Sequence, residues 1–180
     1  LLYQMRVHEG VARSGNQAMF LGILLLHGRD YLNLNVNAQL QEWLEFHLGH
    51  MNSLGFWGKD SSMSHLQFQN GYHQYELLEY LEAPGVDWVR AADEVASLSD
   101  SEGHFAPYPG GGGCYDYDAV FILTGDLGGK HRRFPLLLKT AQTLLSEQNA
   151  DGGFCESLRI RPLSPGNLVA MVKHVGAGKG

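Results

Sequence analysis

Two aspartates one residue apart are the clearest acid–base candidates in the chain. Asp116 and Asp118 follow the glycine run at 110–113 and precede the apolar residues 119–123. When two carboxyl groups crowd together, one keeps its proton to a higher pH than the other, so such a pair can supply a general acid. Aspartate after a glycine run is also a common helix cap, and this structural role is the competing interpretation.

A thiol and an imidazole extend this set. Cys114, Asp116 and His73 are residue types that bind zinc in tetrahedral sites. No Cys-x-x-Cys or His-x-x-x-His spacing gives independent support for a metal. Zinc is therefore one interpretation. Another is that Cys114 and Cys155 are reduced thiols of a cytoplasmic protein, and a disulfide between the two cysteines also stays open.

A repeated phrase organises the chain around these residues. Phe56, Phe105 and Phe154 are spaced 49 residues apart, and each closes an amphipathic stretch, a turn and a glycine. Repetition at a period of roughly 20 to 50 residues is typical of chains that stack one supersecondary unit. The unit predicted here is a helical hairpin, and the three phenylalanines are expected to pack at its turns.

Helical periodicity separates two kinds of helix. A helix that is apolar around most of its circumference is buried on several sides, whereas an amphipathic helix covers it from outside. Aligning the apolar helices at an offset of 43 residues places Tyr72-His73 and Tyr115-Asp116 at equivalent positions. The predicted amphipathic helices are Val36–Leu48, Val86–Leu98 and Pro135–Leu145, with Pro135 in a first turn, and the apolar ones are Asn16–Leu26, Tyr72–Leu81, Tyr115–Leu123 and Asn167–Val175.

These seven helices predict an all-α fold of the α/α-toroid type, with two concentric layers in a single domain over residues 1–180. Seven helices make an arc and do not close a ring. We therefore expect the chain to be a fragment of a longer protein, with further helices or an additional domain completing the toroid.

The mouth of the toroid is the expected ligand site. The N-termini of the inner helices converge there, and their N–H groups and helix dipoles favour carboxylates and anions. We expect a small molecule or an oligosaccharide in the central cavity, with His73 as a catalytic residue beside the two aspartates. The predicted substrate-binding residues are Gln69, Tyr72, His104, Tyr108 and Tyr115.

One stretch of sequence carries a family resemblance. Residues 139–154, which read KTAQTLLSEQNADGGF, resemble the Gln-Trp repeat of squalene and hopene cyclases with phenylalanine in place of tryptophan. The chain as a whole resembles the terpenoid cyclase and protein prenyltransferase superfamily of α/α toroids. Asp116-Tyr117-Asp118-Ala119 is similar to the Asp-x-Asp-Asp acid motif of class II cyclases. This resemblance implies that Asp118 is the general acid and Asp116 its partner, and prenyltransferases use the ligand types of the candidate zinc set.

Three classes of function remain open. The resemblance implies an enzyme that acts on an isoprenoid-type substrate by acid-initiated chemistry in an apolar cavity closed to water. A carbohydrate-active toroid, such as a polysaccharide lyase or glycoside hydrolase, would instead present an open groove with arginine and asparagine beside a histidine. A non-catalytic binding scaffold would show no convergent polar cluster.

Composition narrows the partners. The chain has a formal net charge of −6 and 13 lysines plus arginines, which argues against nucleic-acid binding because that needs a clustered basic face. No apolar run approaches the roughly 18 residues that span a bilayer. The hydrophobic content of 44% is typical of a folded domain, and we expect a cytoplasmic location.

Overall fold

The structure, a computed structural model, describes residues 1–108, 113–125, 130–148 and 150–154. Within these residues it is all-α: it contains seven α-helices, one short 3-10 helix and no strand. The chain divides into two compact units, Leu1–Asp87 and Trp88–Gly180, and each unit is described by itself. The predicted all-α class is confirmed, and the closure of the helices into a toroid stays a prediction.

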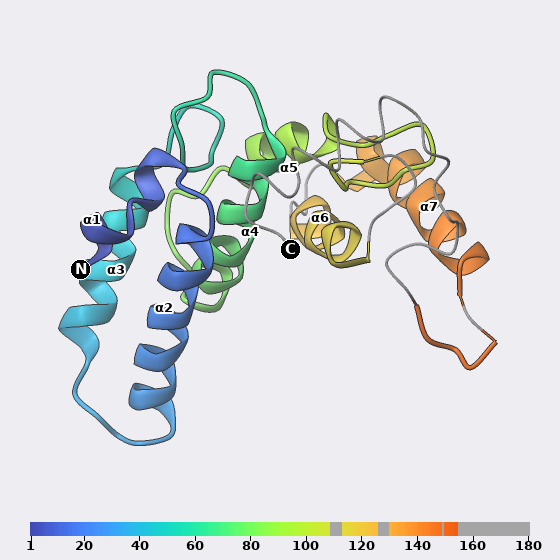
Figure 1. Cartoon of the computed structure of the whole chain (residues 1–180). Helices are drawn as coiled ribbons and strands as arrows, with labels where there is room; N and C mark the ends of the chain where they lie inside the picture. Colours follow the sequence, from blue (N-terminus) through green and yellow to red (C-terminus); the bar gives the residue numbers. More distant parts are fainter. Residues whose placement is uncertain (109–112, 126–129, 149, 155–180) are drawn as a thin grey trace. The chain divides into compact units, whose positions relative to one another are not determined.

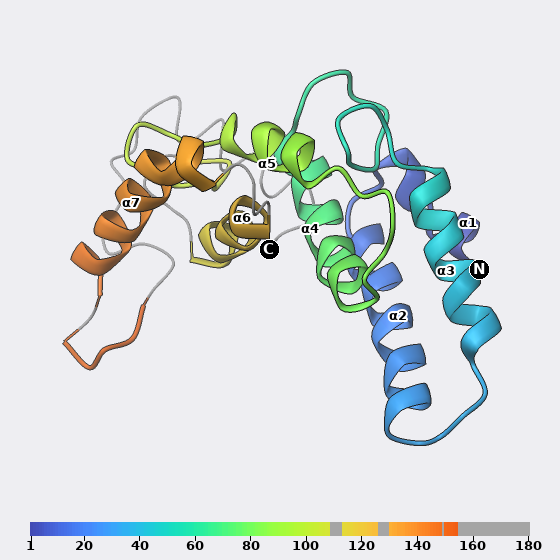
Figure 2. The same cartoon turned by 180° about the vertical axis from the view of Figure 1, so that it is seen from behind.

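The first unit is a layer of three long helices with a short N-terminal segment. The helix α2 lies between α3 and α4 and packs against both (Figures 1 and 2). None of the helices in the described part of the chain combines the length and apolar character needed to cross a membrane. The elements of this unit are α1 (Leu2–Met5), η1 (Val7–Glu9), α2 (Ser14–Asp30), α3 (Asn37–Gly49) and α4 (His65–Tyr80).

Small residues let α2 and α4 approach each other closely. A Cβ atom on Gly15 would lie 2.2 Å from the carbonyl oxygen of Asn70, so only glycine fits there. The Asn70 side chain accepts the Gly15 N–H at 3.1 Å, and Gln74 Nε2 donates to the Gly15 carbonyl at 2.7 Å. Gly15 and Gly71 therefore lie inside helices as packing residues, not before them as the sequence had suggested.

Aromatic residues fill the core of the first unit, and their polar atoms donate hydrogen bonds to backbone carbonyl groups. Trp43 Nε1 donates to the Ala18 carbonyl, and Trp57 Nε1 donates to the His47 carbonyl, both at 2.9 Å. The Tyr75 hydroxyl donates to the Gly55 carbonyl at 2.6 Å. The Trp43 bond ties α3 to α2, and the other two tie the turn after α3 to α3 and α4, while the rings exclude water.

The second unit places one helix against two others. The helix α6 (Gly113–Gly125) packs against α5 (Trp88–Ala96) and α7 (Lys130–Ser146), which are separate chain segments on either side of it in sequence. Gly125 faces the Trp88 ring, which a Cβ atom would meet at 2.6 Å. Pro135 lies inside α7 rather than in its first turn, because the helix begins five residues earlier.

Most predicted helices are present with shifted ends. Five of the predicted segments correspond to α2, α3, α5, α6 and α7. The prediction of a helix beginning at Tyr72 was wrong by seven residues, because Ser64 caps α4 by accepting the Gln67 N–H. The short elements α1 and η1 were not predicted, and the predicted helix Asn167–Val175 lies outside the described residues.

The turns after α3 and α5 share one detailed geometry. In the first, the Asn52 side-chain oxygen accepts the N–H groups of Leu54 and Phe56, and the Asn52 N–H donates to the Phe56 carbonyl. In the second, Asp100 makes the same bonds with Glu102 and His104. The third residue after each Asx is a glycine with positive φ, 82° at Gly55 and 88° at Gly103.

These matching bonds define the true register of the repeat. Asn52 and Asp100 are 48 residues apart, and so are the first residues of α4 and α6. The 49-residue match of Phe56 with Phe105 is therefore wrong at these two turns, because Phe56 corresponds to His104 and Trp57 to Phe105. The 43-residue alignment of the apolar helices is also wrong.

The third turn preserves the glycine conformation but not the burial of its aromatic residue. Gly152 has φ 85°, which matches Gly103 at a spacing of 49 residues. Trp57 and Phe105 are fully buried, whereas Phe154 is 55% exposed. The expectation that Phe154 packs like the other two aromatics is therefore wrong for the described residues.

A buried histidine makes the first unit sensitive to acid. His47 stacks on Trp43 with ring centroids 3.8 Å apart, and its Nδ1–H donates to the Trp43 carbonyl at 2.7 Å. Burial is the main cause that lowers the pKa of His47 to about 4. Between pH 6.5 and 4, His47 is therefore protonated in the unfolded chain but not in the folded chain. The free energy of unfolding consequently decreases as the pH falls through this range.

We expect His47→Gln to remove this acid sensitivity. In the wild type, His47 should lower the free energy of unfolding by about 2.5 kcal/mol between pH 7.5 and pH 4.5. Urea unfolding of both proteins at the two pH values measures it. The exposed His27→Gln serves as the control and should leave the pH dependence as it is; an unchanged pH dependence in His47→Gln would contradict the prediction.

Candidate functional site

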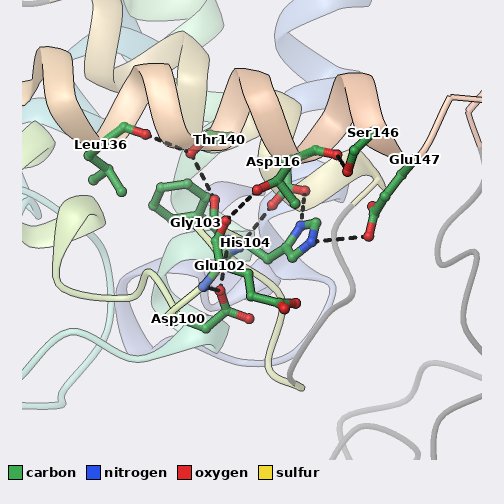
Figure 3. Close-up of polar contacts among 11 residues, drawn as sticks. Asp100, Glu102, Gly103, His104, Asp116, Leu136, Thr140, Ser146 and Glu147 are labelled. Carbon is green, nitrogen blue, oxygen red and sulfur yellow. Dashed lines mark hydrogen bonds and ion pairs between the residues drawn. The ribbon is translucent and has the colours of Figure 1, made fainter.

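A buried carboxylate–imidazole pair lies in the second unit. Asp116 stands in the first turn of α6 and is 0% exposed, and His104 is 1% exposed. Asp116 Oδ2 accepts the Nδ1–H of His104 at 2.7 Å, while its Oδ1 accepts the Phe105 N–H at 2.8 Å (Figure 3). The carboxylate therefore sets both the ring tautomer and the position of the backbone beside it.

The turn that carries His104 is held rigidly from two sides. The Asp100 side chain accepts the His104 N–H at 3.0 Å from within the turn. From α7, the Thr140 hydroxyl donates to the Gly103 carbonyl at 2.8 Å (Figure 3). The Thr143 hydroxyl donates to the Glu102 carbonyl at 2.7 Å. The imidazole is thus fixed before any ligand arrives.

A second carboxylate faces the other ring nitrogen. Glu147, which follows the last residue of α7, places Oε1 3.5 Å from His104 Nε2 (Figure 3). Nε2 is buried and has no hydrogen-bond partner among the described residues. The ring of His104 therefore lies between two carboxylates, with a strong bond to Asp116 and a longer ion-pair contact to Glu147.

Burial and charge shift both members of the buried pair. Burial of the ring would by itself lower the pKa of His104, but the hydrogen bond to Asp116 and the nearby acidic charges outweigh it and raise this pKa. Burial raises the pKa of Asp116, and the hydrogen bonds from His104 and the Phe105 N–H offset only part of this effect. The folded pair therefore holds protons more tightly than the unfolded chain does.

A pocket of about 540 Å³ opens beside this cluster within the second unit. Asp116 and Glu147 belong to its lining, although the Asp116 carboxylate is covered, so Glu147 is the group of the cluster that meets the pocket. The other walls are mainly apolar and aromatic. The remaining lining residues are Gly113, Cys114, Tyr117, Val120, Leu144 and Phe154.

The structure places the two predicted aspartates differently. Asp116 joins the cluster and the pocket, whereas Asp118 is buried and is not part of the pocket lining. His104, predicted to bind substrate, lies behind the pocket as the partner of Asp116. Tyr108 and Tyr115 are buried and are also not among the lining residues.

Three predicted site residues belong to α4 in the first unit. The Tyr72 hydroxyl donates to Glu76 at 2.7 Å, and His73 Nδ1 lies 3.6 Å from the second Glu76 oxygen. Gln69 is half-buried on the same helix. In the corrected register Tyr72 corresponds to Val120 rather than to Tyr115, so the equivalence that had grouped His73 with Asp116 does not hold.

The residues of the predicted zinc set belong to different units of the chain. Cys114 is exposed at the pocket, Asp116 is bonded to His104, and His73 belongs to the other unit. Within the described residues no group of three or more histidine, cysteine, aspartate and glutamate side chains is placed to hold a metal ion.

Glu147 is the site residue that sequence reasoning missed. A weak signal was present, because Glu147 lies three residues after Leu144, directly beyond the predicted amphipathic helix Pro135–Leu145, where the helical spacing would continue. Both residues line the pocket.

The chain was compared with known proteins in three ways. No protein-family model, curated protein or solved structure matches it significantly. The resemblance to terpenoid cyclases and protein prenyltransferases therefore stays a prediction.

The buried pair predicts that stability falls as the pH rises. Because the pKa of His104 is raised on folding, the stabilisation from its proton is complete below about pH 6.5 and is lost as the pH rises through the folded-state pKa. We expect Asp116→Asn to weaken this dependence and to cost about 1–3 kcal/mol at pH 6.

Urea unfolding between pH 6 and 9 measures the effect. Asp118→Asn is the matched control and should keep the wild-type dependence. It removes a buried carboxylate from the same helix that is not one of the acidic groups acting on His104. Equal pH dependence in wild type and Asp116→Asn would show that the pair is not responsible.

Proposed function

We propose that this chain carries the active-site pocket of an enzyme that acts on a small, isoprenoid-type molecule by acid-initiated chemistry. The proton would come from the cluster of Asp116, His104 and Glu147. The observation that supports this most strongly is the replacement of apolar residues by an ionisable pair at equivalent buried positions of the repeat.

The corrected register makes this replacement visible. His104 and Asp116 correspond to Phe56 and Phe68, and all four side chains are at most 1% exposed. The same hairpin turn also forms where the equivalent residues are two phenylalanines, so the architecture does not require charged residues here. Burying a charged pair rarely stabilises a protein more than an apolar pair of similar volume. A role in chemistry accounts for its presence.

Each member of the cluster has a distinct task in this mechanism. Glu147 is the only one that meets the pocket with its carboxyl group partly exposed, so it delivers the proton to a substrate double bond. His104 resupplies Glu147 through Nε2, and Asp116 holds the imidazole by Nδ1 and stabilises its positive charge. We assign the acid role to Glu147 in place of Asp118, which is not among the lining residues.

The pocket walls favour an apolar substrate over a sugar. Its lining includes Tyr117, Val120, Leu144 and Phe154, and no arginine or asparagine is among the described lining residues. A polysaccharide groove needs such polar side chains beside its histidine. A binding scaffold would need no convergent ionisable cluster, so the three-residue cluster favours an enzyme over a scaffold.

The double variant His104→Phe/Asp116→Phe separates chemistry from folding. It installs the pair found at the equivalent positions of the first unit, so we expect a stability within about 2 kcal/mol of the wild type. Turnover of linear polyprenyl alkenes or epoxides, followed by mass spectrometry of the products, should fall at least about a hundredfold in this variant and in Glu147→Gln.

Asp118→Asn and His73→Ala are the matched controls and should retain activity. If Asp118→Asn abolishes turnover while Glu147→Gln does not, the acid is Asp118 and our assignment is wrong. Activity on acidic oligosaccharides alone would replace the proposed function with the carbohydrate one. A folded wild type that turns over neither class would favour the scaffold.

A further inference from the structure

Among the residues that the structure describes, the charges around the pocket are unbalanced. Asp116 and Glu147 are both in its lining, with the Asp116 carboxylate covered, and His104 is the cationic partner of both. The Asp116 carboxylate is hydrogen-bonded to Nδ1 of His104 at 2.7 Å, whereas Glu147 Oε1 lies 3.5 Å from Nε2 of the same ring. Glu147 is thus a largely enclosed carboxylate, 16% exposed, whose pairing with the described part of the chain is incomplete.

Two aromatic side chains line the same pocket as this carboxylate. Tyr117 is 63% exposed and Phe154 is 55% exposed, so a large part of each side chain can be reached from solvent. The face of an aromatic ring attracts a cation, most strongly where water is excluded. A carboxylate next to exposed aromatic rings in an otherwise apolar pocket is the arrangement that binds an organic ammonium group.

We infer that the pocket selects ligands with a positively charged ammonium head on an apolar body, and that it rejects anionic ligands of the same size, including phosphorylated ones. The head would lie between Glu147 and the rings of Tyr117 and Phe154, and the apolar body against Val120 and Leu144. This inference uses the pocket of the proposed function but does not depend on catalysis.

The physical reason is the cost of leaving a buried charge unpaired. An ammonium group completes the pairing of Glu147, whereas a phosphate would add like charge beside two carboxylates. The groups that face His104 are Asp116 on α6, Asp100 in its own turn and Glu147 after α7, and all are acidic. As the pH rises and His104 loses its proton, the pocket becomes more negative and its preference for cations should increase.

Three probes with one chain length test the inference: octyltrimethylammonium, octanol and octyl phosphate, each below its micelle concentration. Isothermal titration calorimetry at pH 6 and pH 8.5 gives the affinities. We expect the ammonium to bind at least about tenfold more tightly than octanol, with octyl phosphate weakest, and its advantage to grow at pH 8.5.

Variants locate the effect in this pocket. Glu147→Gln should reduce the affinity for the ammonium about tenfold and leave octanol binding unchanged. Tyr117→Ala should reduce the affinity for the ammonium more than the affinity for octanol. Glu79→Gln makes an equal change of charge on α4 and should change neither affinity. Octyl phosphate or octanol binding as tightly as the ammonium, or an ammonium preference that survives Glu147→Gln, would overturn the inference.

The outcome is separable from that of the proposed function. Ammonium selectivity without turnover of any isoprenoid would support this inference and count against the enzyme. Turnover of neutral polyenes with no ammonium selectivity would support the enzyme and overturn the inference.

Discussion

The site depends on one local interaction: an Asx side chain that accepts two backbone N–H groups in the turn after a helix, α5 in the second unit. Asp100 satisfies the amides of Glu102 and His104, and Gly103 supplies the left-handed conformation that lets the chain reverse. This turn aims the next residue at the first turn of the following helix. In the second unit that residue is His104, and the side chain it meets is Asp116.

The equivalent turn in the first unit shows which features the turn requires and which side chains it does not. Asn52 makes the equivalent bonds, and the residue delivered is Phe56, which lies within a core of aromatic rings. Backbone bonding and glycine conformation are therefore common to both units, while the side chain at the delivered position differs. A repeat fold can change the chemistry at one position without disturbing its frame, because the frame is built from main-chain bonds.

Access to the pocket distinguishes the members of the cluster. Asp116 is buried and accepts two hydrogen bonds, from His104 and from the Phe105 N–H, which makes it an orienting group. Glu147 follows the last residue of α7 and lines the pocket. The imidazole between them couples a buried carboxylate to an accessible one. Such coupling lets a buried charge influence a ligand that it does not touch.

The all-α class, the positions of most helices and the candidacy of Asp116 and His104 could be predicted from the sequence, because helical periodicity and glycine placement are local properties. The repeat itself was also visible, but its register was not. The sequence contains identical phenylalanines 49 residues apart, and these suggested a period of 49. The correct period of 48 matches Asn52 with Asp100, which are different residue types whose side chains make the same hydrogen bonds to the backbone.

Only the tertiary structure decided which side chains meet. The pairing of His104 with Asp116 depends on a turn whose bonds form in three dimensions, and the contact with Glu147 depends on α7 packing 31 residues later in the chain. Burial, which separates Asp116 from Asp118 and Glu147, is likewise a property of packing. Sequence periodicity specifies the face of a helix, and the distance between atoms on different helices follows only from how those faces pack.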